Sequence, residues 1–314
     1  RKAPAGEGPR DHPGRDNYHI ICEASIVLDH RSSTTHARKV RIEKLGEAKR
    51  KRQRHHKIIQ AAQGCIYCAG QGKVEQIDHM PPRMMFRLSQ RPKGLEFPSC
   101  EACNKGTSRL DVVASFMARS FPGISKSDES QEWDKVVKEA ERVAPGIIDE
   151  MWMTPDEMHI AMLSEGVSDR RFAAFRADGP ILSSHMQAFA GKVGFALHYE
   201  ATGCFVPMEG RVQVRWFTSS EVYRESLPPS LLSSIGEPSA LKQGKINSIG
   251  IFEYGWGQFS ERNEIPIYYA RVRDAFVVAA FVATSEKDLP FAIGELATFA
   301  PGDLAGSPFD RIYY

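Results

Sequence analysis

Residues 65–104 read CIYCAGQGKVEQIDHMPPRMMFRLSQRPKGLEFPSCEACN and contain two Cys-x-x-Cys pairs with an Asp-His pair between them. Four thiolates in two such pairs are the ligands from which proteins build a closed tetrahedral zinc site. The 31 residues between the pairs (69–99) form a longer spacer than that of a simple zinc ribbon. We therefore predict a structural Zn²⁺ that clamps an inserted segment, with these ligands: Cys65, Cys68, Cys100 and Cys103.

The inserted segment has a simple predicted order of strand, loop and helix. Val74–Ile77 favours a short strand that ends in Asp78-His79. The Pro81-Pro82 pair interrupts regular structure, and helical composition resumes at Asn104 and continues to about residue 118.

These motifs, Cys-x-x-Cys, Asp-His followed by a proline, and Cys-x-x-Cys-Asn, resemble the HNH endonucleases. The resemblance covers about residues 65–112. It implies a ββα-metal fold with a catalytic divalent ion and a separate four-cysteine zinc site. It also implies that His79 is the general base and that Asp78 and Asn104 are ligands of the catalytic ion.

Elementary chemistry agrees with these roles. Successive residues of a strand point to opposite faces, so Asp78 and His79 can address the two sides of one phosphate, with the metal near the leaving oxygen and the imidazole near the attacking water. A hard cation such as Mg²⁺ or Mn²⁺ takes oxygen ligands from Asp78 and the Asn104 amide, while the thiolates select zinc.

The chain departs from the family pattern because residues 80–99 contain no Asn, whereas HNH sequences place their middle Asn in this region. Two substitutes for orienting His79 stay open, a backbone carbonyl or Gln90. Likewise, either Ser108 or Asp111, on the helix after Asn104, can complete the metal shell through water.

Positive charge is concentrated before the first cysteine pair. Residues 38–57 contain ten Lys or Arg residues against Glu43 and Glu47, although the whole chain has a net charge of only +2. Such a run gives sequence-independent, salt-sensitive affinity for nucleic acid, and its alternative is a solvated surface helix. We expect these residues to contact nucleic acid: Lys49, Arg50, Lys51, Arg52, Arg54, Lys57, Arg83, Lys105 and Arg109.

Bulk composition narrows the class of protein. The chain has 314 residues and 42% hydrophobic residues, and its longest apolar run, 275–283, is far shorter than the roughly 20 residues of a membrane span. Four of the six cysteines fall in the two pairs, which favours metal binding in a reducing compartment over disulfides. We expect a cytoplasmic protein with no membrane contact.

The predicted fold class is α+β, with a small zinc-stapled ββα-metal module. Amphipathic periodicity predicts helices at 133–143 and 186–197, the second closed by Gly203, and alternation predicts a strand at 212–216 and a hairpin of 267–272 with 275–283. The predicted organisation is a tail with a strand (1–34), a basic helix (35–64), the module (65–118) and a larger α+β recognition or partner domain (119–314).

The predicted function is metal-dependent endonucleolytic hydrolysis of DNA, and the HNH resemblance implies bacterial restriction or defence. Two alternatives stay open. One is a zinc-stabilised nucleic-acid-binding protein without turnover, which the missing middle Asn favours. The other is a protein–protein assembly factor in which the C-terminal domain binds a protein partner or a second copy of the chain.

Overall fold

The computed structural model describes residues 18–22, 49, 52–86, 91–120, 129–164, 166, 172–224, 227–259 and 265–306. Several predictions fall outside these ranges: the tail before residue 18, the basic helix before residue 49, Arg50, Lys51 and Gln90. Residues 52–61 are helical, as the basic run predicts.

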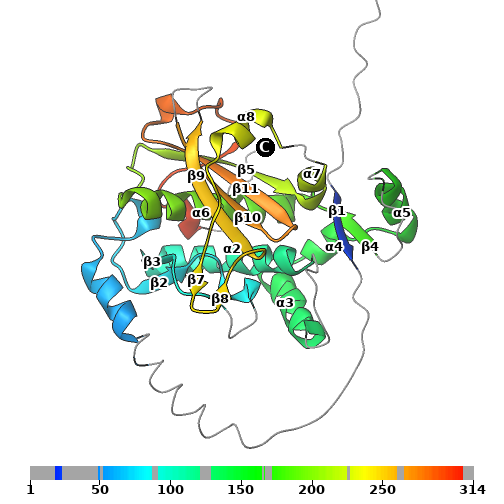
Figure 1. The fold of residues 1–314 in the computed structure, drawn as a ribbon, viewed down its shortest axis with the longest axis horizontal. Helices are drawn as coiled ribbons and strands as arrows, with labels where there is room; N and C mark the ends of the chain where they lie inside the picture. The colour runs from blue at the N-terminus through cyan, green and yellow to red at the C-terminus, as the bar shows by residue number, and fades with distance from the viewer. Residues whose placement is uncertain are drawn as a thin grey trace, which may run out of the picture.

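A six-stranded antiparallel sheet forms the centre of the fold (Figure 1). Its strand order is β12-β5-β11-β10-β9-β6. The strands are β5 (Arg211–Thr218), β6 (Ser239–Ala240), β9 (Phe252–Phe259), β10 (Ile265–Val272), β11 (Phe276–Ala283) and β12 (Ala297–Phe299). The predicted hairpin is confirmed, because β10 pairs with β11 across the turn at residues 273–275.

Strand β11 reads FVVAAFVA without a polar residue because it is buried on both faces. Successive side chains of a strand point to opposite faces. Phe276 and Val278 accordingly join the main hydrophobic core, whereas Val277 and Ala279 join a smaller core on the other face. Helix α8 (Pro229–Ser234) contributes Leu231 to that smaller core.

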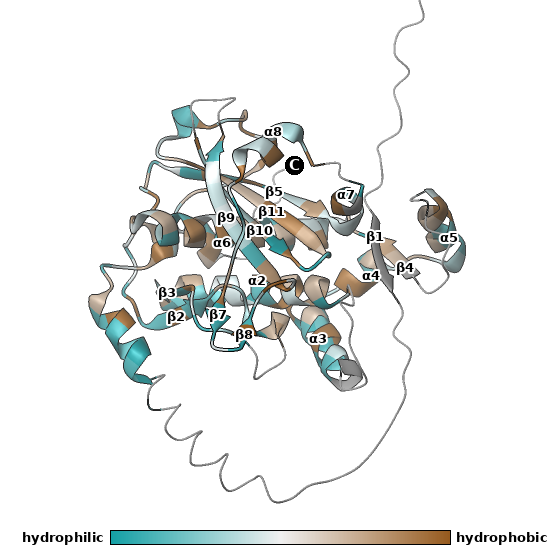
Figure 2. Cartoon of the chain, in the orientation of Figure 1, coloured by the Kyte–Doolittle hydropathy of each residue, from teal (hydrophilic) through white to brown (hydrophobic). Residues whose placement is uncertain are grey.

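Helix α6 (Pro180–Thr202) covers the face of the sheet that carries the main hydrophobic core, where it packs against β5, β10 and β11. Its sequence is apolar almost all round because α2 (Glu101–Ser120) packs against it as well, which gives the order sheet, α6, α2 (Figure 1). Its C-cap is Gly203 at φ 70°, as the sequence predicts. Figure 2 shows the contrast between the hydrophobic strands β10 and β11 and the largely hydrophilic helix at residues 52–61.

The cysteine region folds as a hairpin followed by a helix. Strand β2 (Gln76–His79) pairs antiparallel with β3 (Glu96–Ser99), and α2 begins two residues after β3. Strand β2 begins two residues later than predicted and α2 three residues earlier. The strand β3 was not predicted, since four residues that include Pro98 give little periodicity.

The remaining elements lie around this frame. The predicted amphipathic helix is α3 (Glu129–Val143), and the predicted N-terminal strand is β1 (Tyr18–Cys22), which pairs with β4 (Phe172–Arg176). The other elements are η1 (Ile66–Cys68), η2 (Arg83–Met85), α4 (Ile147–Met151), α5 (Pro155–Ser164), α7 (Ser219–Tyr223), β7 (Lys242–Gln243), β8 (Ile246–Asn247), η3 (Glu286–Asp288) and η4 (Asp303–Ala305).

The fold therefore mixes helices and an antiparallel sheet, as the predicted α+β class requires. One hydrophobic cluster runs through the cysteine region, α3, α6 and one face of the sheet. The predicted module and the region after residue 118 consequently share a core.

The contact between α2 and η4 depends on a glycine. A Cβ at Gly106 would lie 1.9 Å from the backbone oxygen of Leu304. We expect Gly106→Ala to lower the free energy of unfolding by about 1–3 kcal/mol, since the overlap exceeds the gain in helix propensity. Urea unfolding measures this. The control, exposed Ser108→Ala on the same helix, should change it by less than about 0.5 kcal/mol. Parental stability of Gly106→Ala would contradict this packing.

Candidate functional site

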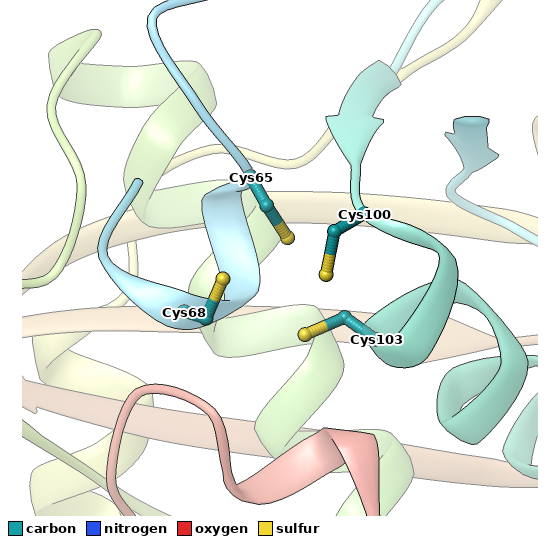
Figure 3. Close-up of side chains that lie close together, drawn as sticks. All are labelled: Cys65, Cys68, Cys100 and Cys103. Atoms are coloured by element: carbon teal, nitrogen blue, oxygen red, sulfur yellow. The ribbon is translucent and has the colours of Figure 1, made fainter. Parts of the chain in front are cut away.

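The four predicted zinc ligands lie together. The sulfur atoms of Cys65, Cys68, Cys100 and Cys103 are all within 4.8 Å of one another. Figure 3 shows them pointing toward a common centre, two from the η1 turn and two from the start of α2. Position 72 requires a glycine, because a Cβ there would lie 2.7 Å from the Cys100 sulfur.

The thiols interact strongly with one another. Hydrogen bonding from Cys103 lowers the pKa of Cys65 to about 5, although burial opposes this shift. The same hydrogen bond raises the pKa of Cys103, and burial together with the negative charge of Cys65 raises that of Cys68 to about 11. Four sulfurs at this spacing, three of them on buried cysteines, form a donor set for a soft divalent cation, and Zn²⁺ fits it.

A cavity of about 410 Å³ lies beside the hairpin and α2. All three residues predicted to be catalytic, Asp78, His79 and Asn104, line it. The remaining lining residues are His55, Gln76, Ile77, Pro82, Arg83 and Asp111. The cavity therefore brings together carboxylate, imidazole, amide and guanidinium groups from β2, α2, the helix at 52–61 and η2.

Asp78 is 5% exposed and has two buried partners. The Tyr67 hydroxyl donates to its carboxylate, and the Lys192 ammonium lies 3.0 Å from Oδ1 and 2.9 Å from Oδ2. Burial alone would raise the pKa of Asp78, but the positive charge of Lys192 and the hydrogen bond from Tyr67 lower it below its ordinary value. Both partners therefore favour the ionised form of the Asp78 carboxylate.

Lys192 also contacts Asp111, with Nζ 2.6 Å from Oδ1. Burial, followed by the charge of Asp78, raises the pKa of Asp111 to about 7 although Lys192 opposes the shift. The two carboxylates keep the pKa of Lys192 above its ordinary value despite complete burial. Sequence reasoning missed Lys192, and the signal was a single lysine inside the apolar run of α6 (AFAGKVGFAL).

His79 lies at the end of β2, and a guanidinium group contacts one of its ring nitrogens. Arg83 contacts Nε2 of His79, and because a guanidinium can only donate, Nε2 accepts. Glu96, directly opposite on β3, has a carboxylate oxygen 3.7 Å from the same nitrogen. Burial, followed by the positive charges of Arg83 and Arg91, lowers the pKa of His79 to about 3.

His79 and Asn104 each have polar neighbours in the structure. Glu96 lies 3.7 Å from Nε2 of His79, the nitrogen that Arg83 also contacts, whereas Gln90 falls outside the described residues. The Asn104 Oδ1 accepts from the Ser99 hydroxyl at 3.4 Å. Of the two residues proposed to complete the metal shell, Asp111 lines the cavity, while Ser108 is exposed and donates to the Lys105 carbonyl.

The basic residues take different positions. Within the described part of the helix, Lys49, Arg52 and Lys57 are exposed, as are Arg83, Lys105 and Arg109. Arg54 instead forms an ion pair with Glu96, which ties the helix to β3. Arg91, not predicted as functional, donates to four backbone carbonyls and so fixes the loop before β3: those of Met80, Pro81, Pro92 and Gly94.

A second group of donor atoms lies at the edge of the cavity. Nitrogens of His55 and His79 and an oxygen of Glu96 are within 4.8 Å of one another. Guanidinium groups already contact two of the three, since Arg54 pairs with Glu96 and Arg83 contacts His79. Arginine side chains therefore supply the positive charge next to these three donor atoms.

Comparison of the chain with protein-family models, curated proteins and solved structures gave no match. Among the described residues, none of the helices combines the length and the apolar character that crossing a membrane requires.

The four-cysteine cluster predicts one tightly held zinc per chain. Cys103→Ser is expected to lose most of this zinc and to lower the melting temperature, because the cluster joins η1 to the start of α2. Elemental analysis with thermal unfolding measures both. Cys204→Ser is the matched control, since Cys204 is exposed and outside the cluster, and it should keep the full zinc content. Equal zinc content in the two variants would contradict the site.

Proposed function

We propose that the protein is a metal-dependent endonuclease that hydrolyses phosphodiester bonds in DNA. The observation that carries this proposal is the single cavity lined by Asp78, His79 and Asn104, next to the four-cysteine cluster. A carboxylate, a neutral imidazole and an amide around one open space are the groups that metal-assisted hydrolysis uses.

His79 acts as general base toward a water molecule in the cavity. Its ring is neutral at neutral pH, as a base requires, and Arg83 contacts its Nε2. A phosphate that draws the exposed Arg83 to itself would free Nε2 and replace positive charge near the ring with negative charge. Both effects raise the pKa of His79 toward the range that suits a general base.

Asp78 and Asn104 are the oxygen donors for a divalent cation. They fit Mg²⁺ or Mn²⁺, which prefer oxygen ligands, and the lowered pKa of Asp78 keeps its carboxylate ionised. The cation would stabilise the charge that develops on the leaving oxygen. Asp111 lies close enough to the same space to share this role through water.

The hairpin followed by a helix supports an HNH-like assignment. In that family the same order of two strands and a helix holds the general base and the metal ligands. The missing middle Asn remains a departure, because Glu96, which faces His79 across the hairpin, lies near the same Nε2 that would act as the base.

Electrostatics supports nucleic acid as the substrate. The helix at 52–61 exposes Arg52 and Lys57 and contributes His55 to the lining of the cavity, and Arg83, Lys105 and Arg109 lie exposed on η2 and α2. Neutralisation of phosphates by such residues gives affinity for any sequence. The Arg54 ion pair to Glu96 holds the helix beside the hairpin.

A second candidate function is nucleic-acid binding without turnover. It is favoured by the contact between Arg83 and His79 and by the low pKa of His79, because a base this weak accepts a proton poorly. The same protein would then bind DNA through its basic surface and leave the phosphodiester intact.

His79→Ala separates the two. We expect the zinc-loaded parent to nick supercoiled plasmid in the presence of Mg²⁺ or Mn²⁺, and His79→Ala to nick at least about 100-fold more slowly, because removal of a general base typically costs 10²–10⁴-fold in rate. Agarose electrophoresis of the plasmid over time measures the rate.

The control is His159→Ala, an exposed histidine on α5 outside the cavity, which should nick at the parental rate. DNA binding is measured on the same proteins by gel shift. If neither the parent nor His79→Ala nicks while both shift DNA, the non-catalytic function holds instead.

A further inference from the structure

Lys192 is the most deeply placed charge beside the cavity. Its side chain is fully buried, and its ammonium contacts both oxygens of Asp78 and one of Asp111 at 2.6–3.0 Å. An ammonium has three N–H donors, so these contacts can satisfy all of them inside the protein. The two ends of the Lys192–Asp78 contact are 114 residues apart in the chain.

Burial of a charge is costly unless partners compensate for it, and apolar side chains of similar size often serve stability as well or better. Stability by itself therefore does not explain why a lysine lies in the tightly packed middle of α6. Its position gives it a second use, because it contacts Asp78 and Asp111, both of which line the cavity.

The Asp78 carboxylate offers about four lone-pair positions. Tyr67 and Lys192 together make three contacts to this carboxylate, which fixes its plane and leaves one position for a further ligand. Because Lys192 is 0% exposed, it does not reach a substrate in the cavity itself. Its action is confined to the groups it holds.

We propose that Lys192 is a positioning residue of the active site, which holds the Asp78 carboxylate in the orientation that presents an oxygen to the catalytic cation. This role rests on the proposed endonuclease function. It places part of the catalytic centre outside the cysteine region, since α6 belongs to the segment after residue 118. The hairpin and α2 supply the reacting groups, and α6 supplies the charge that orients one of them.

The test compares the full-length, zinc-loaded parent with Lys192→Met and Lys192→Gln. Plasmid nicking with Mn²⁺ gives kcat and KM for DNA, and thermal unfolding gives the melting temperature. We expect Lys192→Met to lower kcat about 10- to 100-fold, the usual effect of losing a group that orients a metal ligand, with KM for DNA unchanged. Lys192→Gln, which keeps a hydrogen-bond donor, should retain more of the parental kcat.

A purely structural role gives a different pattern. The melting temperature then falls, but kcat measured below the transition equals that of the parent, and this result overturns the proposal. If Lys192→Met fails to fold, Lys192→Gln carries the comparison, and a parental kcat in that variant overturns it equally. A parent that nicks no faster than His79→Ala overturns the endonuclease function, and the role of Lys192 with it.

Discussion

Four cysteine sulfurs within 4.8 Å of one another impose the strongest constraint on this structure. Thiolates so close together repel one another unless a cation binds them, so the cluster couples folding of the region to metal binding. The cluster joins η1 to the start of α2, and the β2–β3 hairpin lies between those two points. This link between η1 and α2 helps to fix the hairpin residues that line the cavity.

Buried electrostatics links this region to the rest of the chain. The ammonium of Lys192 balances Asp78 and Asp111, and the hydrophobic core runs without interruption from the cysteine region into α6 and the sheet. The region after residue 118 therefore supports the groups that line the cavity. Two arginines add positive charge next to the hairpin, since Arg54 pairs with Glu96 and Arg83 contacts His79.

Sequence reasoning could predict what depends on local patterns. The helices α3 and α6, the β10–β11 hairpin and the cysteine cluster follow from periodicity, a glycine cap and ligand spacing, and the cavity gathers the three predicted residues Asp78, His79 and Asn104. Lys192 and Glu96 could not be predicted, because their contacts join segments 17–114 residues apart and depend on how those segments pack. A lone charge in an apolar helix was the one available signal.

The central claim is that a hard cation binds between Asp78 and Asn104 beside the four-cysteine zinc site. Anomalous diffraction from crystals soaked in Mn²⁺ tests it directly. We expect a zinc peak at the centre of the four sulfurs and a manganese peak in the cavity, with oxygens of Asp78 and Asn104 as ligands. A manganese peak between His55, His79 and Glu96, or no manganese in the cavity, would contradict it.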